Sequence, residues 1–189
     1  MKITHIAFAT ALGATLLASP AMAQQKLDAA QSQLQFTARQ MGVPLEGQFK
    51  KFDAQVAFDP AKLATSKINF TVDTGSATLG SKETDAELPK PVWFNVPKFP
   101  QAVFESTSIK ALGAGKYEVA GKLTIKGTSV NVVVPTTLTQ AGAITTAMGT
   151  LPIKRLAFKI GENEWADTSM VADDVQVKFK LALTGVGKL

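Results

Sequence analysis

The sequence of 189 residues contains no cysteine, and its single histidine is His5. Without cysteine, the chain cannot form a disulfide, a thiolate nucleophile or a zinc–thiolate site. His5 lies in an N-terminal segment that we expect to be cleaved off, so the remaining chain has no imidazole to act as a general base or metal ligand. Histidine-dependent catalysis and histidine-ligated metal or haem sites are thereby excluded. We expect a binding protein that has no cofactor and is not an enzyme, although carboxylates, lysine and tyrosine remain available.

The first 23 residues have the three parts of a secretory signal. Lys2 supplies a positive start, residues 3–17 are mostly apolar, and Ala21-Met22-Ala23 has small residues at both positions of an A-x-A cleavage site. The apolar stretch is shorter than the roughly 20 residues that a membrane anchor needs. The sequence therefore predicts a cleaved signal peptide at residues 1–23, followed by one exported domain at residues 24–189.

The charge of this domain is mildly positive. Removal of Lys2 leaves 19 basic and 15 acidic residues, a net charge of +4. Such a charge suits loose attraction to an anionic membrane surface. The lysines are spread along the chain rather than clustered, so nucleic acid is not an expected partner.

Apolar residues recur with a period of two in short runs, which is typical of antiparallel β-strands. Tyr117, Val119, Gly121, Leu123 and Ile125 form the longest such face, and Lys126-Gly127 supplies a tight turn into the next run. Nine such regions predict a fold of about eight strands: 34–38, 56–58, 68–72, 102–110, 117–125, 129–138, 141–149, 153–160 and 175–183.

One connection resembles a helix instead. Ser81 could cap a helical segment that extends to Pro91, with Pro89 and Pro91 ending it. Many antiparallel strands with one long connection predict an all-β fold, either an up-and-down barrel or a sandwich. A barrel of about eight strands can be filled by side chains or can hold one small ligand. Alternation alone leaves both interiors open.

Several motifs occur in one order along nearly the whole exported domain. The most specific are Trp93-Phe94-Asn95, the segment from Phe99 to Ser106 (FPQAVFES) and the segment from Gly121 to Gly127 (GKLTIKG). In these motifs the chain closely resembles the YceI family of periplasmic, lipocalin-like, polyisoprenoid-binding proteins. Asn95 stands where the family often has aspartate, and Ala157-Phe158-Lys159 replaces a common Asp-Phe-Gly.

The resemblance implies an extended, eight-stranded antiparallel barrel with a short helical segment at its mouth. It further implies a periplasmic protein that binds or transports a long-chain amphiphile, such as a polyisoprenoid or isoprenoid quinone, with a link to envelope stress. Family members are often dimeric, so a homodimer is a further expectation. The alternative is an accessory to quinone redox chemistry, which would need a membrane cytochrome as its partner.

The candidate ligand-binding residues are apolar side chains that alternation or the family motifs direct inward. They are Phe36, Phe58, Phe70, Trp93, Phe94, Phe99, Phe104, Leu123, Val132, Phe158 and Phe179. For each of them, packing into a solid core is the competing interpretation. Arg155 is the candidate for a polar head group because its guanidinium is a rigid fork of donors. The competing interpretation pairs Arg155 with a carboxylate such as Asp73 or Glu105.

Overall fold

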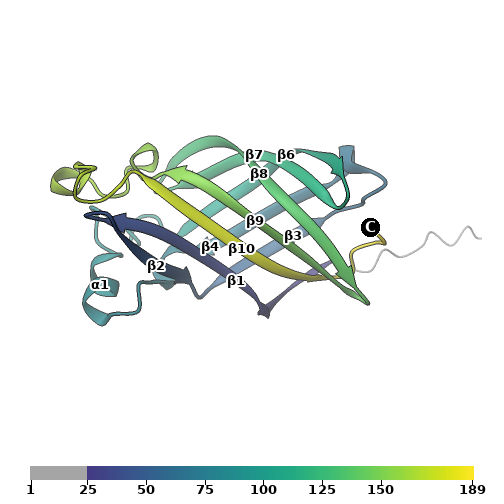
Figure 1. Ribbon diagram of the computed structural model, residues 1–189, viewed down its shortest axis with the longest axis horizontal. Coiled ribbons are helices and arrows are strands. Elements are labelled where there is room, and N and C mark those ends of the chain that lie inside the picture. Colours follow the sequence, from purple (N-terminus) through teal and green to yellow (C-terminus); the bar gives the residue numbers. More distant parts are fainter. Residues whose placement is uncertain (1–24) are drawn as a thin grey trace, which may run out of the picture.

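In the computed structural model, which describes residues 25–189, one antiparallel sheet curls into a barrel (Figure 1). The predicted signal peptide at residues 1–23 lies outside the described residues. The strands of the described part are β1 (Lys26–Gln40), β2 (Val43–Phe49), β3 (Phe52–Ala57), β4 (Lys67–Asp73), β5 (Ala77–Thr78), β6 (Gln101–Gly113), β7 (Lys116–Ile125), β8 (Thr128–Ala141), β9 (Ile144–Lys154) and β10 (Asp174–Thr184).

These ten strands make an eight-membered ring. From β6 to β10 each strand pairs with the next, and β1 pairs with both β10 and β2. The chain runs from β2 into β3 through Lys50-Lys51, and from β4 into β5 through the 3₁₀ turn η2 (Thr74–Ser76). β2 and β3 thus form one interrupted strand, and β4 and β5 form another. Because β2 pairs with β5 and β3 pairs with β4, the two interrupted strands pair with each other and close the ring. The predicted all-β, eight-stranded, up-and-down barrel is confirmed.

The β7–β8 hairpin forms as the sequence predicts. Ile125 pairs with Thr128, and the two residues between them, Lys126 and Gly127, have φ angles of 50° and 75°. Positive φ at both central positions is the type I′ geometry that matches the twist of paired strands. Glycine adopts such an angle without steric cost, which explains its place in the turn.

One predicted strand is wrong. Residues 141–149 and 153–160 were expected to form separate strands, but β9 runs without a break to Lys154 and pairs with β10 along its whole length. The chain then turns into the 3₁₀ helix η3 (Arg155–Phe158), which ends at Lys159 with a left-handed φ of 57°. The apolar alternation at 156–160 therefore belongs to a turn that packs on the barrel end.

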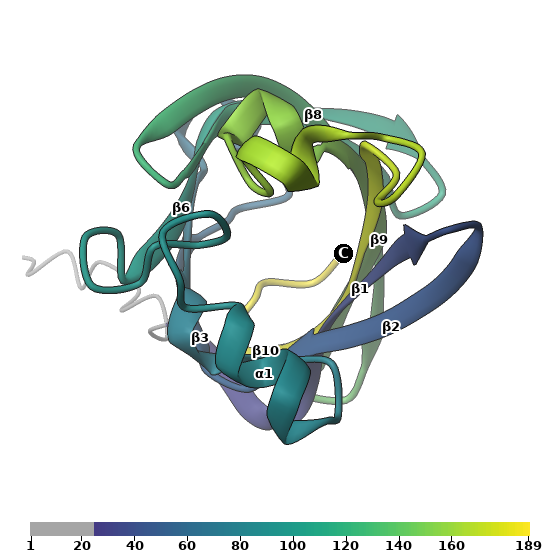
Figure 2. The same ribbon diagram turned by 90° about the vertical axis from the view of Figure 1, so that its left-hand side faces the viewer.

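Three helical segments gather at one end of the barrel, called the mouth below (Figures 1 and 2). They are α1 (Lys82–Glu87), η3 and η4 (Asn163–Ala166). The helix α1 is shorter than the predicted segment 81–91, and Ser81 is its N-cap residue but makes no side-chain cap bond. The C-terminal residues and η1 (Leu63–Thr65) lie at the opposite end (Figure 1). None of the described helices is long and apolar enough to cross a membrane.

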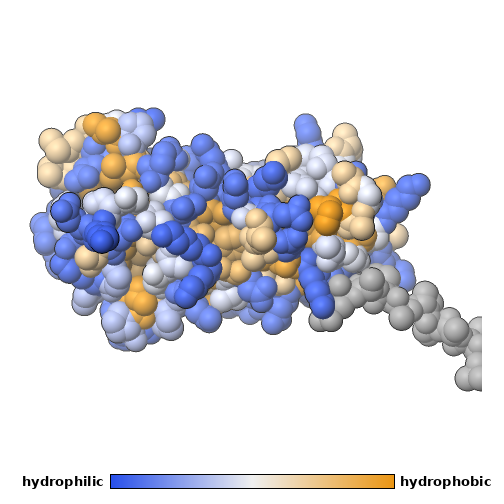
Figure 3. Space-filling view, turned by 90° about the horizontal axis from the view of Figure 1, so that it is seen from below, coloured by the Kyte–Doolittle hydropathy of each residue, from blue (hydrophilic) through white to orange (hydrophobic). Residues whose placement is uncertain are grey.

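The buried side chains form two clusters along the barrel. The one nearer the mouth is built around Leu34, Val72 and Phe158, and the other around Phe58, Val119 and Val134. Hydrophilic side chains dominate the outer face seen in Figure 3, with smaller apolar areas between them. This division follows from the period of two, because neighbouring residues of a strand point to opposite faces.

Candidate functional site

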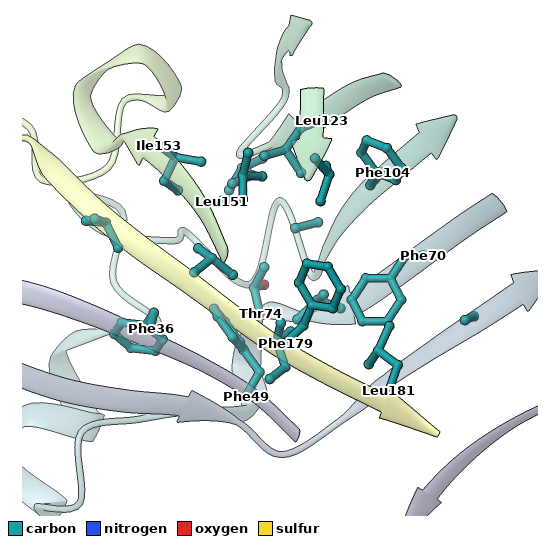
Figure 4. Close-up of a pocket in the computed structure, with 18 of the residues that line it drawn as sticks. Phe36, Phe49, Phe70, Thr74, Phe104, Leu123, Leu151, Ile153, Phe179 and Leu181 are labelled. Carbon is teal, nitrogen blue, oxygen red and sulfur yellow. The ribbon is translucent and has the colours of Figure 1, made fainter. Parts of the chain in front are cut away.

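A cavity of about 390 Å³ lies inside the barrel. Alternate residues of the strands form its wall, and Figure 4 shows Phe36, Phe104 and Phe179 on separate strands around the common space. Eight of the eleven predicted apolar residues line it: Phe36, Phe58, Phe70, Trp93, Phe94, Phe104, Leu123 and Phe179. Of the two interiors that the sequence left open, the structure therefore has the hollow one.

The buried polar side-chain groups of the wall are satisfied by the protein itself. The Oγ1 of Thr74, a residue only 2% exposed, donates to the carbonyl of Phe99 at 2.9 Å. Thr145 is fully buried, and its Oγ1 accepts from Nε2 of Gln140 at 3.1 Å. Within the described chain, every buried side-chain nitrogen or oxygen has a hydrogen-bond partner. The wall thus presents hydrocarbon surface and needs no polar ligand to complete it.

Aromatic rings surround the mouth. The ring centroids of Trp93 and Trp165 lie 5.4 Å apart, and those of Phe49 and Phe94 lie 5.9 Å apart in an edge-on arrangement. All four line the cavity together with Leu88, which follows α1. Figure 2 looks into this end, where α1 lies across from the segment that carries η3 and η4. Polar residues also reach the wall here, namely Gln40, Thr84 and Glu87.

The helix α1 is tied to the barrel by Asp85. Its carboxylate accepts hydrogen bonds from Oγ1 of Thr78 at 2.5 Å and from the backbone N–H of Leu79 at 2.7 Å. These two bonds, with the Thr78 bond the larger effect, hold the pKa of Asp85 below its usual value. The acidic side chain therefore fixes one edge of the mouth.

The opposite end is covered by the C-terminal residues. Nε2 of Gln140 donates to the carbonyls of Val186 and Gly187 at 3.3 and 3.2 Å, and its Oε1 accepts from the N–H of Leu189. Val186 lines the cavity as a result. Figure 2 shows this last segment running across the far end of the bore.

Arg155 lines the cavity, but its hydrogen bonds go to the protein's own backbone. Nε donates to Ala172, Nη1 to Ile160 and Gly161, and Nη2 to Trp165 and Val171, in every case to a backbone carbonyl at 2.6–3.0 Å. A guanidinium has five N–H donors, so none remains for a head group. The alternative pairing with Asp73 or Glu105 is also wrong.

Arg155 is buried at the mouth and connects several segments there. The residue is 2% exposed, and this desolvation lowers the pKa of its guanidinium, while the nearby charge of Asp173 acts in the opposite direction. Its five carbonyl partners come from the segments 160–165 and 171–172. Arg155 therefore gathers the segment after β9 into a fixed shape beside the opening.

Three predicted lining residues lie off the cavity wall. Phe99 packs its ring over Gly127 in the β7–β8 turn, where a Cβ would meet the ring at 2.7 Å. Phe158 belongs to η3 and is 1% exposed within the solid cluster near the mouth. Val132 faces inward opposite Gly121, but it packs into the deeper cluster beside Phe104. Phe158 and Val132 thus follow the core interpretation, whereas Phe99 belongs to neither buried cluster and covers the turn instead.

Other wall residues escaped the sequence analysis. Ile109 faces inward because a register shift between Ser106 and Ser108 reverses the alternation of β6. Phe49 lies in β2, a strand that was not predicted, and Trp165 lies in the η4 segment. A larger group of wall residues lies on the apolar faces that the alternation predicts, comprising Leu34, Val56, Ile68, Val72, Tyr117, Val177, Leu181 and Leu183. Leu151 also lines the wall, but it lies between the predicted strands 141–149 and 153–160.

A closed antiparallel barrel around an apolar cavity defines a lipocalin-like fold. Residues 25–183 match the YceI-like domain family, and the chain belongs to that family. The match to UPF0312 proteins of Yersinia pestis is 37% identical and covers 58% of this chain and 57% of the relative's length. A UPF0312 protein of Ectopseudomonas mendocina is 35% identical over 67% of this chain and 68% of its own length.

Solved structures have the same fold. The crystal structure of Burkholderia cenocepacia BcnA is 49% identical, covers 82% of this chain and 98% of its own, and superposes with a TM-score of 0.80. A polyisoprenoid binding domain from Saccharophagus degradans has a TM-score of 0.70, covering 85% and 98% of the two chains. Its sequence is 14% identical, so that likeness concerns the fold alone.

Proposed function

We propose that the barrel binds one long, apolar, isoprenoid-type chain, such as that of a polyprenyl lipid or isoprenoid quinone, and carries it in the periplasm. The observation that supports this most is the cavity, whose wall is almost wholly hydrocarbon and whose buried polar side-chain atoms are already paired. A polar ligand would lose its hydrogen bonds with water there without gaining new partners, whereas a hydrocarbon chain has no such hydrogen bonds to lose.

The length of the barrel suits a chain rather than a compact ligand. β10 has 11 residues, and at about 3.3 Å per residue it is roughly 36 Å long. A strand tilt of about 40° leaves roughly 28 Å along the barrel axis. Each buried CH₂ contributes about 0.8 kcal/mol, and ordering the flexible chain offsets much of that gain. The Saccharophagus relative, described as a polyisoprenoid binding domain, agrees with this ligand class.

The polar end of the ligand would lie at the mouth. Gln40, Thr84 and Glu87 line the cavity there, while Val186 of the C-terminal segment lines the opposite end. Export rests on the predicted signal peptide, and binding requires no catalytic residue. The link to envelope stress and the quinone-redox role with a membrane cytochrome stay predictions of the family resemblance.

The decisive experiment is to express the full sequence in a Gram-negative host and purify the protein from the periplasmic fraction. Extraction with organic solvent and mass spectrometry should then find a stoichiometric isoprenoid lipid. Recovery from the cytoplasm alone would contradict the location, and a protein without bound lipid that also binds no added polyprenyl alcohol would contradict the ligand.

A matched pair of variants tests whether the lipid lies inside the barrel. Leu151 lines the cavity, and the neighbouring Thr150 is exposed on the outer face of the same strand. Leu151→Glu should abolish lipid retention because a carboxylate cannot be hydrated in the cavity, whereas Thr150→Glu should retain lipid like the unchanged protein. Equal retention by both variants would place the lipid elsewhere.

A further inference from the structure

Three glycines on the inner face of the barrel each lie beneath a phenylalanine ring. A Cβ atom at Gly47 would overlap the ring of Phe36. At Gly121 it would lie 2.5 Å from Cε2 and Cζ of Phe104, and at Gly149 it would lie 2.5 Å from Cζ of Phe179. These distances are far below van der Waals contact, so each ring occupies the place that a side chain on the glycine would fill.

Strand register produces this arrangement. Phe36 pairs directly with Gly47, and Phe179 pairs directly with Gly149. Phe104 pairs with Leu123 and leans diagonally over Gly121, two residues further along β7. A glycine in a strand allows the close approach of another group to its backbone. Each phenylalanine ring therefore lies flat across the neighbouring strand. The side chain does not point straight toward the barrel axis.

The three ring–glycine pairs are distributed around the barrel. One joins β1 to β2, one joins β6 to β7, and one joins β9 to β10. All three rings line the cavity. Wherever a ring lies across a glycine, it takes less of the bore than it would if it pointed at the axis.

We infer that these ring–glycine pairs set the width of the bore and so select the thickness of the chain that the barrel accepts. This inference rests on the proposed function and deepens it. The pair Phe36–Gly47 is the most selective because it is the nearest of the three to the mouth (Figure 4): Phe36 pairs with Val177, two residues closer than Phe179 to the mouth end of β10. A chain that enters from the mouth passes this ring before the other two.

Gly47 is also the best position for a test. A methyl group at Gly121 would press on the carbonyl of Glu105, and one at Gly149 on the carbonyl of Pro135, so both changes would disturb the sheet itself. At Gly47 the three nearest atoms all belong to the ring of Phe36. The substitution Gly47→Ala must therefore turn that ring away, and the cavity is the space open to it.

The experiment measures the affinity of two probes, a polyprenyl alcohol and the unbranched saturated alcohol of equal carbon number. One misplaced methylene in an apolar pocket changes affinity roughly 10- to 200-fold, so Gly47→Ala should weaken the branched probe by that factor and the slender one less. The double variant Gly47→Ala with Phe36→Ala should restore binding. Gln48→Ala, on the exposed face of β2, should bind both probes like the unchanged protein.

The outcomes separate this inference from the proposed function. Equal affinities of Gly47→Ala and the unchanged protein for both probes would overturn the inference and leave the proposed function intact. An unchanged protein that binds neither probe would overturn the proposed function. In that case a crystal structure of Gly47→Ala still decides the inference, since a Phe36 ring that stays across residue 47 contradicts it.

Discussion

Nζ of Lys126 lies 2.8 Å from Oε2 of Glu162 and joins the β7–β8 turn to the segment beside the mouth. The same ammonium donates to the carbonyl of Lys159 at 2.7 Å. The Lys126 side chain is only 5% exposed, whereas that of Glu162 is 45% exposed. The ion pair is therefore half accessible to water, and its role is to fix a loop more than to add stability.

This ion pair predicts an acid dependence of stability. The hydrogen bond from Lys126 is the main cause that lowers the pKa of Glu162 from 4.5. A lowered pKa stabilises the folded state above the unfolded pKa, and this stabilisation is lost as the pH falls through the folded value. Urea denaturation should find Glu162→Gln less stable than the unchanged protein at neutral pH, with a difference that shrinks below about pH 4.5.

Glu164 provides the control for that measurement because it is exposed and lies in the same segment. Glu164→Gln should follow the unchanged protein at every pH. A deficit of Glu162→Gln that stays constant from neutral to acid pH would show that the carboxylate charge is not what stabilises the segment.

Replacement of Arg155 by lysine should destabilise the protein. An ammonium has three donors, so at least two of the five carbonyls that Arg155 satisfies would lose their partner. Each buried unsatisfied group costs about 1–3 kcal/mol, and Tm should fall by roughly 5–15 °C. Arg39→Lys, at the exposed second arginine of the chain, should change Tm little.

The same variant separates the two roles considered for Arg155. If the guanidinium only organises the mouth, the folded fraction of Arg155→Lys keeps its lipid at temperatures below its Tm. Loss of lipid with an unchanged Tm would instead restore the head-group role.

Gln140 should control the closure of the deep end. Gln140→Ala removes the donor to the carbonyls of Val186 and Gly187, each bond contributing about 1 kcal/mol. The terminal segment then loosens, and bound chain should transfer to acceptor vesicles several times faster. Thr139→Ala, on the exposed face of β8, is the matched control. Equal transfer rates for both variants would show that the terminal segment does not retain the ligand.

The chain's two tryptophans are natural reporters of binding. Trp93 and Trp165 both line the mouth, 5.4 Å apart between ring centroids. A hydrocarbon chain beside them should displace water and shift their emission to shorter wavelength. Trp93→Phe and Trp165→Phe should each keep part of the shift, and Leu151→Glu should show none. A full shift in Leu151→Glu would mean that the probe binds outside the cavity.

Much of the fold was predictable because strand formation is a local property. The alternation in Tyr117 to Ile125 and the turn at Lys126-Gly127 each depend on neighbouring residues, and both predictions are confirmed. The strand predicted at 153–160 is wrong because apolar alternation also occurs in turns. The interactions that bend this segment come from residues distant in the sequence. Arg155 shows this, since its partners extend to Ala172.

The site was predictable only in part. By itself, the sequence determined an all-β chain whose alternate residues are apolar, and its motifs determined the family. Only the tertiary structure decided that the interior is hollow, because that depends on register across strands: Phe36 folds over Gly47 and Phe179 over Gly149, while Phe99 and Phe158 pack outside the wall. Alternation says which side of a strand a ring is on, and only the neighbouring strand decides whether the ring fills the barrel or lies against it.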